Sequence, residues 1–542
     1  MRGSVRAGIA FAVALALCAG GVAAAERTYT YEIRHDRWSE ADERDWRDFI
    51  AAIGKSDCNT LDACLRSSAN PFRDTDKPGV VFKSDCAELP YILRFYFAWK
   101  RGLPFSFESA VSARGGEARD LRYSRYGNEV TQRFDVPNGA NGYTIIEHLR
   151  GAVSSASYRI HPDLETPLES DFYSPKIDPQ SIRPGTVVYD PAGHVGIVFD
   201  VDGKGRVHFF DAHTDFSLTE MTYDLRFTRM KPSVGAGFKN WRPQRLVGYT
   251  KRADGVLTGG HIEMAANAEI VDFSDEQFFG NGKKPKDANW KDGAFTLKGE
   301  ALDYYDYVRA QLAGGMLLFE PVSEIADLAQ SSCTDLHYRA QAVSLAMTRG
   351  IENRPEPDRL PPNIYGADGD WEMYSTPSRD ARLKTSFKYI RDTAQRFVEM
   401  AARHDPHLSY AGSDIAGDLL QAYNNATQFC RVTYTNSDGS RTTLGYEDAR
   451  KRLFAMSFDP YQCIEHRWGD SAATTCADGD VKRDWYDAEQ SLRNQLERTY
   501  DAQMDFTLQQ LQMQKPGIGA PPDTDVRAYL LRAGTQPPDK AP

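Results

Sequence analysis

The sequence predicts an α+β domain, in which one buried helix packs on an antiparallel sheet, followed by a mostly α-helical domain. Three observations predict this fold class. Lys83 to Arg101 is a long apolar and aromatic run that is typical of a buried helix. Gly185 to His213 holds β-branched and alternating runs that are typical of strands joined by turns. From about Leu297 onward, apolar residues recur at helical spacing among many charged residues.

Length and composition indicate a globular chain with more than one core. At 542 residues, two or three domains are expected. The contents of 41% hydrophobic and 26% charged residues fit a globular protein. The net charge of −11 argues against a nucleic-acid partner, because there is no basic excess to neutralise phosphates. After the first 25 residues no stretch is apolar enough for an integral membrane span.

Residues 1–25 have the pattern of a cleaved signal peptide. Two arginines among the first six residues supply the positive start, Ile9 to Cys18 is the apolar core, and Ala23 to Ala25 is a small-residue cleavage site. Cys18 raises the alternative of a lipoprotein, which we disfavour because Leu17 stands where a small residue is expected. We therefore expect a periplasmic or secreted protein.

Removal of the signal peptide leaves seven cysteines, an odd number for an oxidising compartment in which disulfides form. Three disulfides are favoured by position in the chain: Cys58 with Cys64, Cys463 with Cys476, and Cys333 with Cys430. Sequence alone does not fix this connectivity. The pairing leaves Cys86 over, and Cys86 is the cysteine that a nucleophile hypothesis requires as a thiol.

The domain boundaries follow from changes in pattern. Residues 26–255 are expected to form the α+β domain, with helices over Ser39–Ile53 and Thr144–Val153 beside the Cys86 helix. Residues 256–296 are rich in Gly, Asn and Lys and are expected to be a linker. Residues 297–515 are expected to form an α-helical accessory domain, and residues 516–542 a disordered Pro-rich tail. The expected helices of the accessory domain are Leu302–Leu312, Pro321–Met347, Ser378–His404, Asp414–Cys430, Tyr446–Phe458 and Val481–Gln512.

Cys86 and His194 are the candidate nucleophile and base. Cys86 opens the buried helix, where the helix N-terminus and a nearby imidazole are expected to lower the thiol pKa. Pro90 then lies in the first turn, so the helix is expected to have its cap near Ser84 or Asp85 or an irregular first turn. His194 begins a predicted strand, as expected for an imidazole held beside the thiol.

Asp211 and His213 are the candidates for the group that orients His194. A two-residue turn at Asp202-Gly203 would set His194 opposite Asp211, and a turn at Gly203-Lys204 would set it opposite His213. Asp211 is preferred, because a carboxylate both fixes the imidazole tautomer and stabilises the imidazolium. The candidate catalytic residues are therefore Cys86, His194, Asp211 and His213.

No metal and no cofactor are expected. The residues of a partial calcium-loop pattern have Lys204 at a ligand position and strand-like flanks: Asp200, Asp202, Gly205 and Asp211. A zinc site would lack the spacings of known zinc hydrolases, with candidate ligands His194, His208, Asp211 and His213. Three further histidines are expected at solvated helix ends: His404, His407 and His466.

Two motifs resemble those of the NlpC-type cysteine peptidases. DCAEL at Asp85–Leu89 resembles their Asp-Cys-small-x-apolar signature. PGTVVY and GHVGIVFDV within Pro184–Val201 resemble their histidine strand. The resemblance covers about residues 82–244. Three departures put the substrate in doubt more than the fold: Pro90 in the nucleophile helix, Thr186 where the family usually has Asp, and a long gap between Cys86 and His194.

The resemblance implies a papain-like fold, shared with the related CHAP amidases, and cleavage of peptide or amide bonds in the bacterial cell wall. Cys86 would then attack the carbonyl, and the backbone N–H of Cys86 would contribute to an oxyanion hole. The expected partner is a peptide or cell-wall peptide substrate. Two alternatives stay open: a catalytically silent scaffold whose helical half docks an envelope protein, and an acyltransferase or transglutaminase-like use of the same triad.

Overall fold

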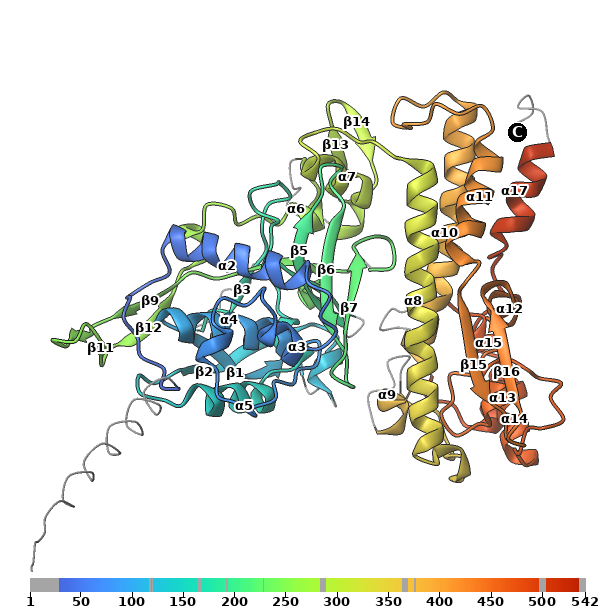
Figure 1. The fold of residues 1–542 in the computed structure, drawn as a ribbon, viewed down its shortest axis with the longest axis horizontal. Coiled ribbons are helices and arrows are strands. Elements are labelled where there is room, and N and C mark those ends of the chain that lie inside the picture. Colours follow the sequence, from blue (N-terminus) through green and yellow to red (C-terminus); the bar gives the residue numbers. More distant parts are fainter. Residues whose placement is uncertain are drawn as a thin grey trace, which may run out of the picture.

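The computed structural model describes an α+β region followed by a helical region (Figure 1). It describes residues 29–116, 118, 120–162, 168–191, 194–227, 229–282, 289–362, 369–374, 377–496 and 504–535. The predicted signal peptide at residues 1–25 lies outside these residues. The mixed α+β class with antiparallel sheets and a helical C-terminal region is confirmed.

A six-stranded antiparallel sheet forms the centre of the α+β region. Its strands lie in the order β3-β8-β4-β5-β6-β7. The β-branched and aromatic residues of β4, β5 and β6 are buried in the core, which explains why these runs form the inner strands. The strands are β3 (Phe172–Tyr173), β4 (Val187–Asp190), β5 (His194–Val201), β6 (Val207–Ala212), β7 (Leu218–Thr222) and β8 (Gly237–Trp241).

The apolar run after Cys86 forms helix α4 (Glu88–Arg101), which is buried on nearly every side. It shares one core with the helix α2 (Glu40–Gly54) and the sheet, and aromatic rings make up much of that core. The ring of Phe97, for example, lies 5.7 Å from that of Trp46. Around it lie the helices α3 (Leu61–Arg66) and α5 (Gly142–Ala152).

The described residues of the predicted linker, 256–282 and 289–296, are packed against the sheet region. Its residues form short strands and a helix that pack on the sheet region, and Phe278 and Phe295 are buried there. The side chain of Gln277 bonds the backbone of Phe238 in β8 in both directions. The remaining elements of the α+β region are β1 (Ser106–Ala113), β2 (Asn128–Asp135), β9 (Gln244–Val247), β10 (Thr250–Lys251), β11 (Leu257–Thr258), β12 (His261–Met264), α6 (Glu276–Phe279), β13 (Phe295–Leu297) and β14 (Glu300–Leu302).

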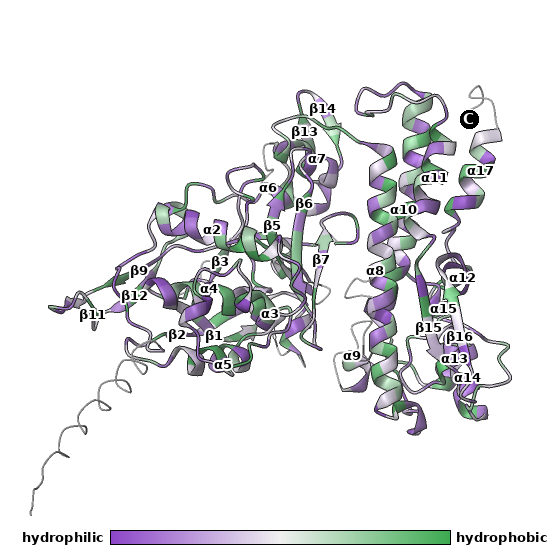
Figure 2. Cartoon of the chain, in the orientation of Figure 1, coloured by the Kyte–Doolittle hydropathy of each residue, from purple (hydrophilic) through white to green (hydrophobic). Residues whose placement is uncertain are grey.

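The helical region is built around α8 (Pro321–Thr348), α10 (Pro377–Ala402), α11 (Ile415–Thr427) and α17 (Val526–Thr535), which lie side by side (Figure 1). Figure 2 shows polar and apolar residues alternating along α8, as expected for a helix packed on one side. In the part of the chain that the structure describes, no helix combines the length and the apolar character needed to cross a bilayer. The other elements are α7 (Tyr304–Leu312), α9 (Asp370–Met373), β15 (Arg431–Thr435), β16 (Arg441–Gly445), α12 (Tyr446–Arg452), α13 (Ile464–Arg467), α14 (Asp480–Ala488), α15 (Gln490–Arg493) and α16 (Leu508–Gln514).

The predicted disordered tail at 516–542 is wrong over residues 516–535. Helix α17 lies there, and its Val526 and Leu530 are each 1% exposed in the core of the helical region. Composition misled the prediction, because the Pro-rich segment precedes a helix that has an apolar face. Residues 536–542 lie outside the described residues.

Three disulfides join the cysteines as predicted: Cys58–Cys64, Cys333–Cys430 and Cys463–Cys476. Cys333–Cys430 connects α8 to the residue before β15 across 97 positions of the chain. Cys86 is outside these three bonds.

Candidate active site

Cys86 lies in the turn directly before α4, and Asp85 holds that turn in place. The Asp85 side chain accepts hydrogen bonds from the backbone N–H groups of Ala87 and Glu88, both at 3.0 Å. The Glu88 carboxylate accepts in return from the Asp85 N–H at 3.0 Å, which completes a capping box. Pro90 falls in the first turn of α4 (Glu88–Arg101), where a helix tolerates proline.

The thiol of Cys86 lies against the strand that carries the histidine. The backbone of Val195, directly after His194 in β5, interacts with this thiol, as does the backbone of Ala87. Cys86 and His194 also line one cavity of about 160 Å³. The structure therefore brings the predicted nucleophile and the predicted base together from positions 108 residues apart.

Asp211 is the group that contacts His194. The Asp211 carboxylate forms an ion-pair contact with Nε2 of His194, and it accepts a hydrogen bond of 2.7 Å from the hydroxyl of Thr219 in β7. With Nε2 facing Asp211, Nδ1 is the imidazole nitrogen that remains for a reaction partner.

The register of the β5–β6 pair explains how this contact arises. The connection is a five-residue loop and not a two-residue turn, because Val201 pairs with Val207, and a register shift lies between Val198 and Asp200. Beyond that shift Ile197 pairs with Phe210, so extending the register by three residues sets His194 opposite position 213. Asp211 is then the diagonal neighbour on the same face, within reach of a side chain as long as histidine.

His213 lies beside this pair, but the residue that contacts the His194 imidazole is Asp211. Nε2 of His213 lies 2.8 Å from the Thr219 hydroxyl and 3.8 Å from the Asp211 carboxylate. Burial disfavours a charge on His213 and, despite the attraction of Asp211, lowers its pKa to about 4. His213 is therefore neutral at pH 7.

Charge on Asp211 is stabilised chiefly by its contact with His194. Burial alone would raise the pKa of this fully buried carboxyl, but the attraction and hydrogen bond of His194, and of His213 once acid has protonated it, outweigh burial and hold the pKa below its ordinary value. A permanently ionised Asp211 fixes the tautomer of His194 and stabilises the imidazolium form that a general base must pass through.

The expectation of a lowered thiol pKa is not met at Cys86. Burial raises the pKa of this thiol well above the ordinary value, and the negative charges of Asp85 and Asp211 raise it further. The bonds from the Val195 and Ala87 backbone act in the opposite direction but are weaker. The expected effect of a helix start is outweighed first by burial and then by the two nearby carboxylates. The thiol is therefore protonated in the resting protein.

The cavity beside Cys86 is walled by both regions of the chain. Residues of the long segment between Cys86 and His194 line one side, and residues of α8, α9 and α10 line another. Sequence patterns around the motifs gave no sign of these lining residues, because they come from segments up to about 300 positions away. They are Arg122, Tyr123, Ser154, Ser155, Tyr338, Glu372, Ser378, Arg379 and Arg382.

The candidate calcium ligands are not brought together, and of the four candidate zinc ligands His194, Asp211 and His213 lie together while His208 lies beside Asp202. Asp202 accepts from the backbone N–H groups of Lys204 and Arg206 and from the Arg206 guanidinium, so it closes the β5–β6 loop. His208 lies 3.7 Å from Asp202, away from the pair of His194 and Asp211. The described residues hold two groups of three or more ligand-type side chains, and both include a disulfide and lie in the helical region.

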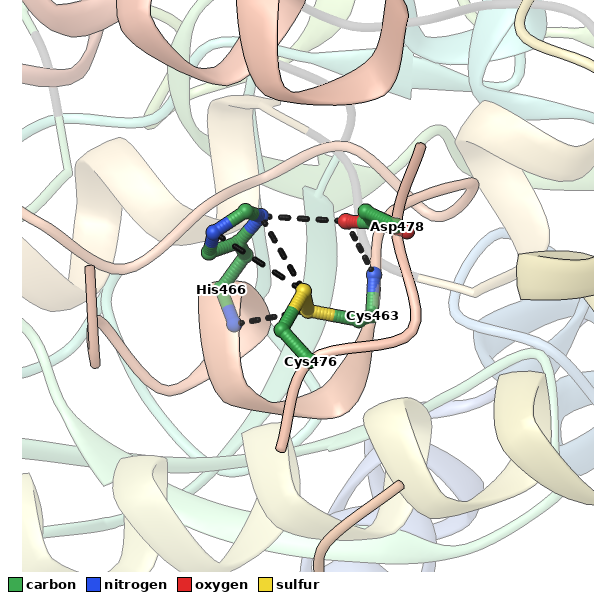
Figure 3. Close-up of side chains that lie close together, drawn as sticks. All are labelled: Cys463, His466, Cys476 and Asp478. Atoms are coloured by element: carbon green, nitrogen blue, oxygen red, sulfur yellow. Dashed lines mark hydrogen bonds and ion pairs between the residues drawn. A yellow bond between two sulfur atoms is a disulfide. The ribbon is translucent and has the colours of Figure 1, made fainter. Parts of the chain in front are cut away.

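One of these groups surrounds the Cys463–Cys476 disulfide (Figure 3). Nδ1 of His466 lies 3.0 Å from the carboxylate of Asp478, which also accepts from the Cys463 N–H at 2.9 Å. The prediction of a solvated His466 is wrong, since it is 5% exposed and stacks on Tyr486. Because the two sulfurs are bonded to each other, we interpret this group as a buried disulfide that stabilises the helical region. His404 is exposed as predicted, and the partly exposed His407 pairs with Glu300.

Neither a family model, nor a curated protein, nor a solved structure matches this chain.

Proposed function

We propose that this protein is a cysteine hydrolase of papain-like arrangement that cleaves an amide or peptide bond. The observation that carries the proposal is the meeting of Cys86 and His194 in one cavity, with His194 oriented by Asp211. A nucleophile, a base within its reach and a third group that orients the base are the parts of an acyl-transfer site.

We assign the steps of the proposed reaction to particular atoms. The thiol proton of Cys86 passes to Nδ1 of His194 while the sulfur attacks the substrate carbonyl carbon, and the carbonyl oxygen becomes an oxyanion. The backbone N–H of Cys86, in the turn before α4, is proposed as one donor to that oxyanion. Collapse of the tetrahedral intermediate breaks the C–N bond, and His194 returns the proton to the leaving amine. Water, deprotonated by His194, then releases the acyl group from sulfur.

The raised pKa of Cys86 supports a mechanism in which the thiol proton leaves during the attack of the sulfur and not before it. Because the resting thiol is protonated, His194 must remove the proton as the sulfur attacks, in the manner of a serine hydrolase. Asp211 is ionised, so the imidazolium that forms is stabilised at the moment it appears. A preformed thiolate–imidazolium pair is not required.

The proposed substrate is a cell-wall peptide and the proposed location is the periplasm or the exterior of the cell. Three disulfides support an oxidising compartment. The resemblance of the Cys86 and His194 motifs to NlpC-type peptidases supports the peptide substrate. A silent scaffold is the second candidate, favoured by the raised thiol pKa and by the wall that the helical region builds over the thiol.

Hydrolysis of cell-wall peptides by purified protein, followed as released amine, tests the proposal. Cys86→Ala and His194→Ala are expected to reduce kcat by about 10⁴-fold, and Asp211→Asn by about 10²–10⁴-fold, because each breaks the proton relay. His208→Ala is the matched control: it lies on β6 two strand positions from Phe210, beside Asp202, and is expected to leave the rate unchanged. Wild-type protein that releases no amine, with Cys86→Ala identical to it, supports the scaffold instead.

A further inference from the structure

Two arginines of the helical region face the cavity beside Cys86. Arg379 and Arg382 are three residues apart in α10 and therefore share one face of that helix. Both line the cavity, together with Ser378 of the same first turns. The N-terminus of α10 thus borders the cavity, and its backbone dipole adds positive potential there.

A stack of rings connects these arginines to the catalytic pair. The His213 ring lies 5.9 Å from that of His194, and the Tyr338 ring of α8 lies 4.0 Å from that of His213. The guanidinium of Arg379 lies 4.9 Å from the centre of the Tyr338 ring. Arg379 is therefore held close to the reacting groups by residues that bridge the two regions of the chain.

The fields of both arginines reach the catalytic groups. Arg379 and Arg382 each contribute to lowering the pKa of His213, after the larger effects of burial and of Asp211. Arg382 also contributes to lowering the pKa of Asp211. Their positive charge is thus felt inside the cavity and is not confined to the outer surface.

Charged residues of other elements line the cavity as well, and the acidic ones are Asp85, Asp190 and Glu372. Arg122 binds Asp120 and forms an ion pair with Glu372, which ties the segment after β1 to α9. Asp85 caps the turn before α4. The wall formed by α10 contributes two positive charges, Arg379 and Arg382, to the same cavity of about 160 Å³ that the thiol borders.

We propose that Arg379 and Arg382 bind a carboxylate of the substrate, so that the enzyme selects peptides with a free carboxylate next to the scissile amide. This inference rests on the proposed function of Cys86 and His194. Guanidinium groups match carboxylates in shape and hydrogen-bonding geometry, and two of them on one helix face suit a carboxylate better than a neutral amide. The carboxylate can be a peptide C-terminus or an acidic side chain.

A probe that needs no turnover separates this inference from the proposed function. The rate of alkylation of Cys86 is measured by peptide mass with iodoacetate and with iodoacetamide, which differ in one carboxylate. We expect Arg379→Gln with Arg382→Gln to lower the iodoacetate-to-iodoacetamide rate ratio by about tenfold, the size of one charge-assisted contact. Arg391→Gln is the matched control, since it lies on the same helix but binds Asp523 away from the cavity.

Peptide substrates then identify the source of the carboxylate. Matched peptides carry a free C-terminus or a C-terminal amide, and separately a Glu or a Gln side chain, and kcat/KM is compared for each pair. The double Gln variant is expected to lose the preference through KM, while Arg379→Lys with Arg382→Lys retains part of it. Variants that fold, as judged by thermal unfolding, but keep the wild-type ratio for both alkylating reagents and peptides overturn the carboxylate site. Wild-type protein that hydrolyses none of the peptides, combined with a reagent ratio that the double Gln variant lowers, overturns the proposed function alone.

Discussion

Helices α4 and α10 both border the cavity, yet they are fixed by different forces. Helix α4 is embedded among aromatic rings, such as Tyr91 against Trp241 at 5.0 Å. Helix α10 is held by buried charge: Asp380 accepts two bonds of 3.0 Å from Arg339, and Lys384 donates to the Arg493 carbonyl. Helix α4 is thus placed largely by ring packing, together with the buried ion pair of Lys100 and Asp76, and helix α10 by buried ionic contacts together with apolar residues such as Phe387.

The largest expected effect is on the free energy of unfolding, and it compares the loss of a disulfide in the helical region with the loss of one in the α+β region. Replacing Cys333 and Cys430 by Ala opens a loop of 97 positions and is expected to cost about 4–5 kcal/mol of unfolding free energy, whereas replacing Cys58 and Cys64 costs about 2 kcal/mol. The reason is that the longer loop gains more entropy in the unfolded chain. Urea unfolding of both variants at pH 7 measures the difference. Equal losses would show that the helical region does not depend on its long-range crosslink.

Breaking the buried ion pair is the next largest change. Asp380→Asn leaves Arg339 buried without its counter-charge and is expected to cost about 3 kcal/mol. Burial disfavours the charged carboxyl, but Arg339 outweighs it and lowers the pKa of Asp380. The stabilisation is therefore present above the unfolded-state pKa and is lost as the pH falls through the folded-state value, so acid should loosen the helical region.

The exposed pair of Lys388 and Asp392 on the same helix provides the control, because Asp392→Asn should cost no more than about 0.5 kcal/mol. Chemical unfolding with a tryptophan signal at pH 7 compares the two variants. If both lose the same stability, α10 is not held by its buried charges.

A smaller effect tests whether the sheet region has any acid sensitivity of its own. His213 is buried and neutral with a pKa near 4, so protons bind more tightly to the unfolded chain. Stability is then complete above the unfolded-state pKa and decreases as the pH falls toward 4, by about 2 kcal/mol at pH 4.5. His213→Gln is expected to flatten the dependence of urea stability on pH between 7 and 4.5. A profile unchanged by this substitution would contradict the buried neutral state.

The sequence predicted the parts of the molecule whose patterns are local. Alternation and apolar runs located β5, β6 and α4, and proximity along the chain predicted two of the disulfides correctly. The register was not predictable, because the shift between Val198 and Asp200 has no signature in the residue types. The cavity wall of α10 was missed for a different reason: Arg379 and Arg382 look like ordinary surface residues of a helix until tertiary packing places them opposite Cys86.

The burial of Cys86 has a consequence for the disulfides of the folded chain. Seven cysteines follow the predicted signal peptide, and six form three specific bonds. Thiol–disulfide exchange proceeds through the thiolate, so a thiol kept protonated by its surroundings is a slow attacker of neighbouring disulfides. In the folded α+β region Cys86 is thereby a slow partner for exchange with the three disulfides.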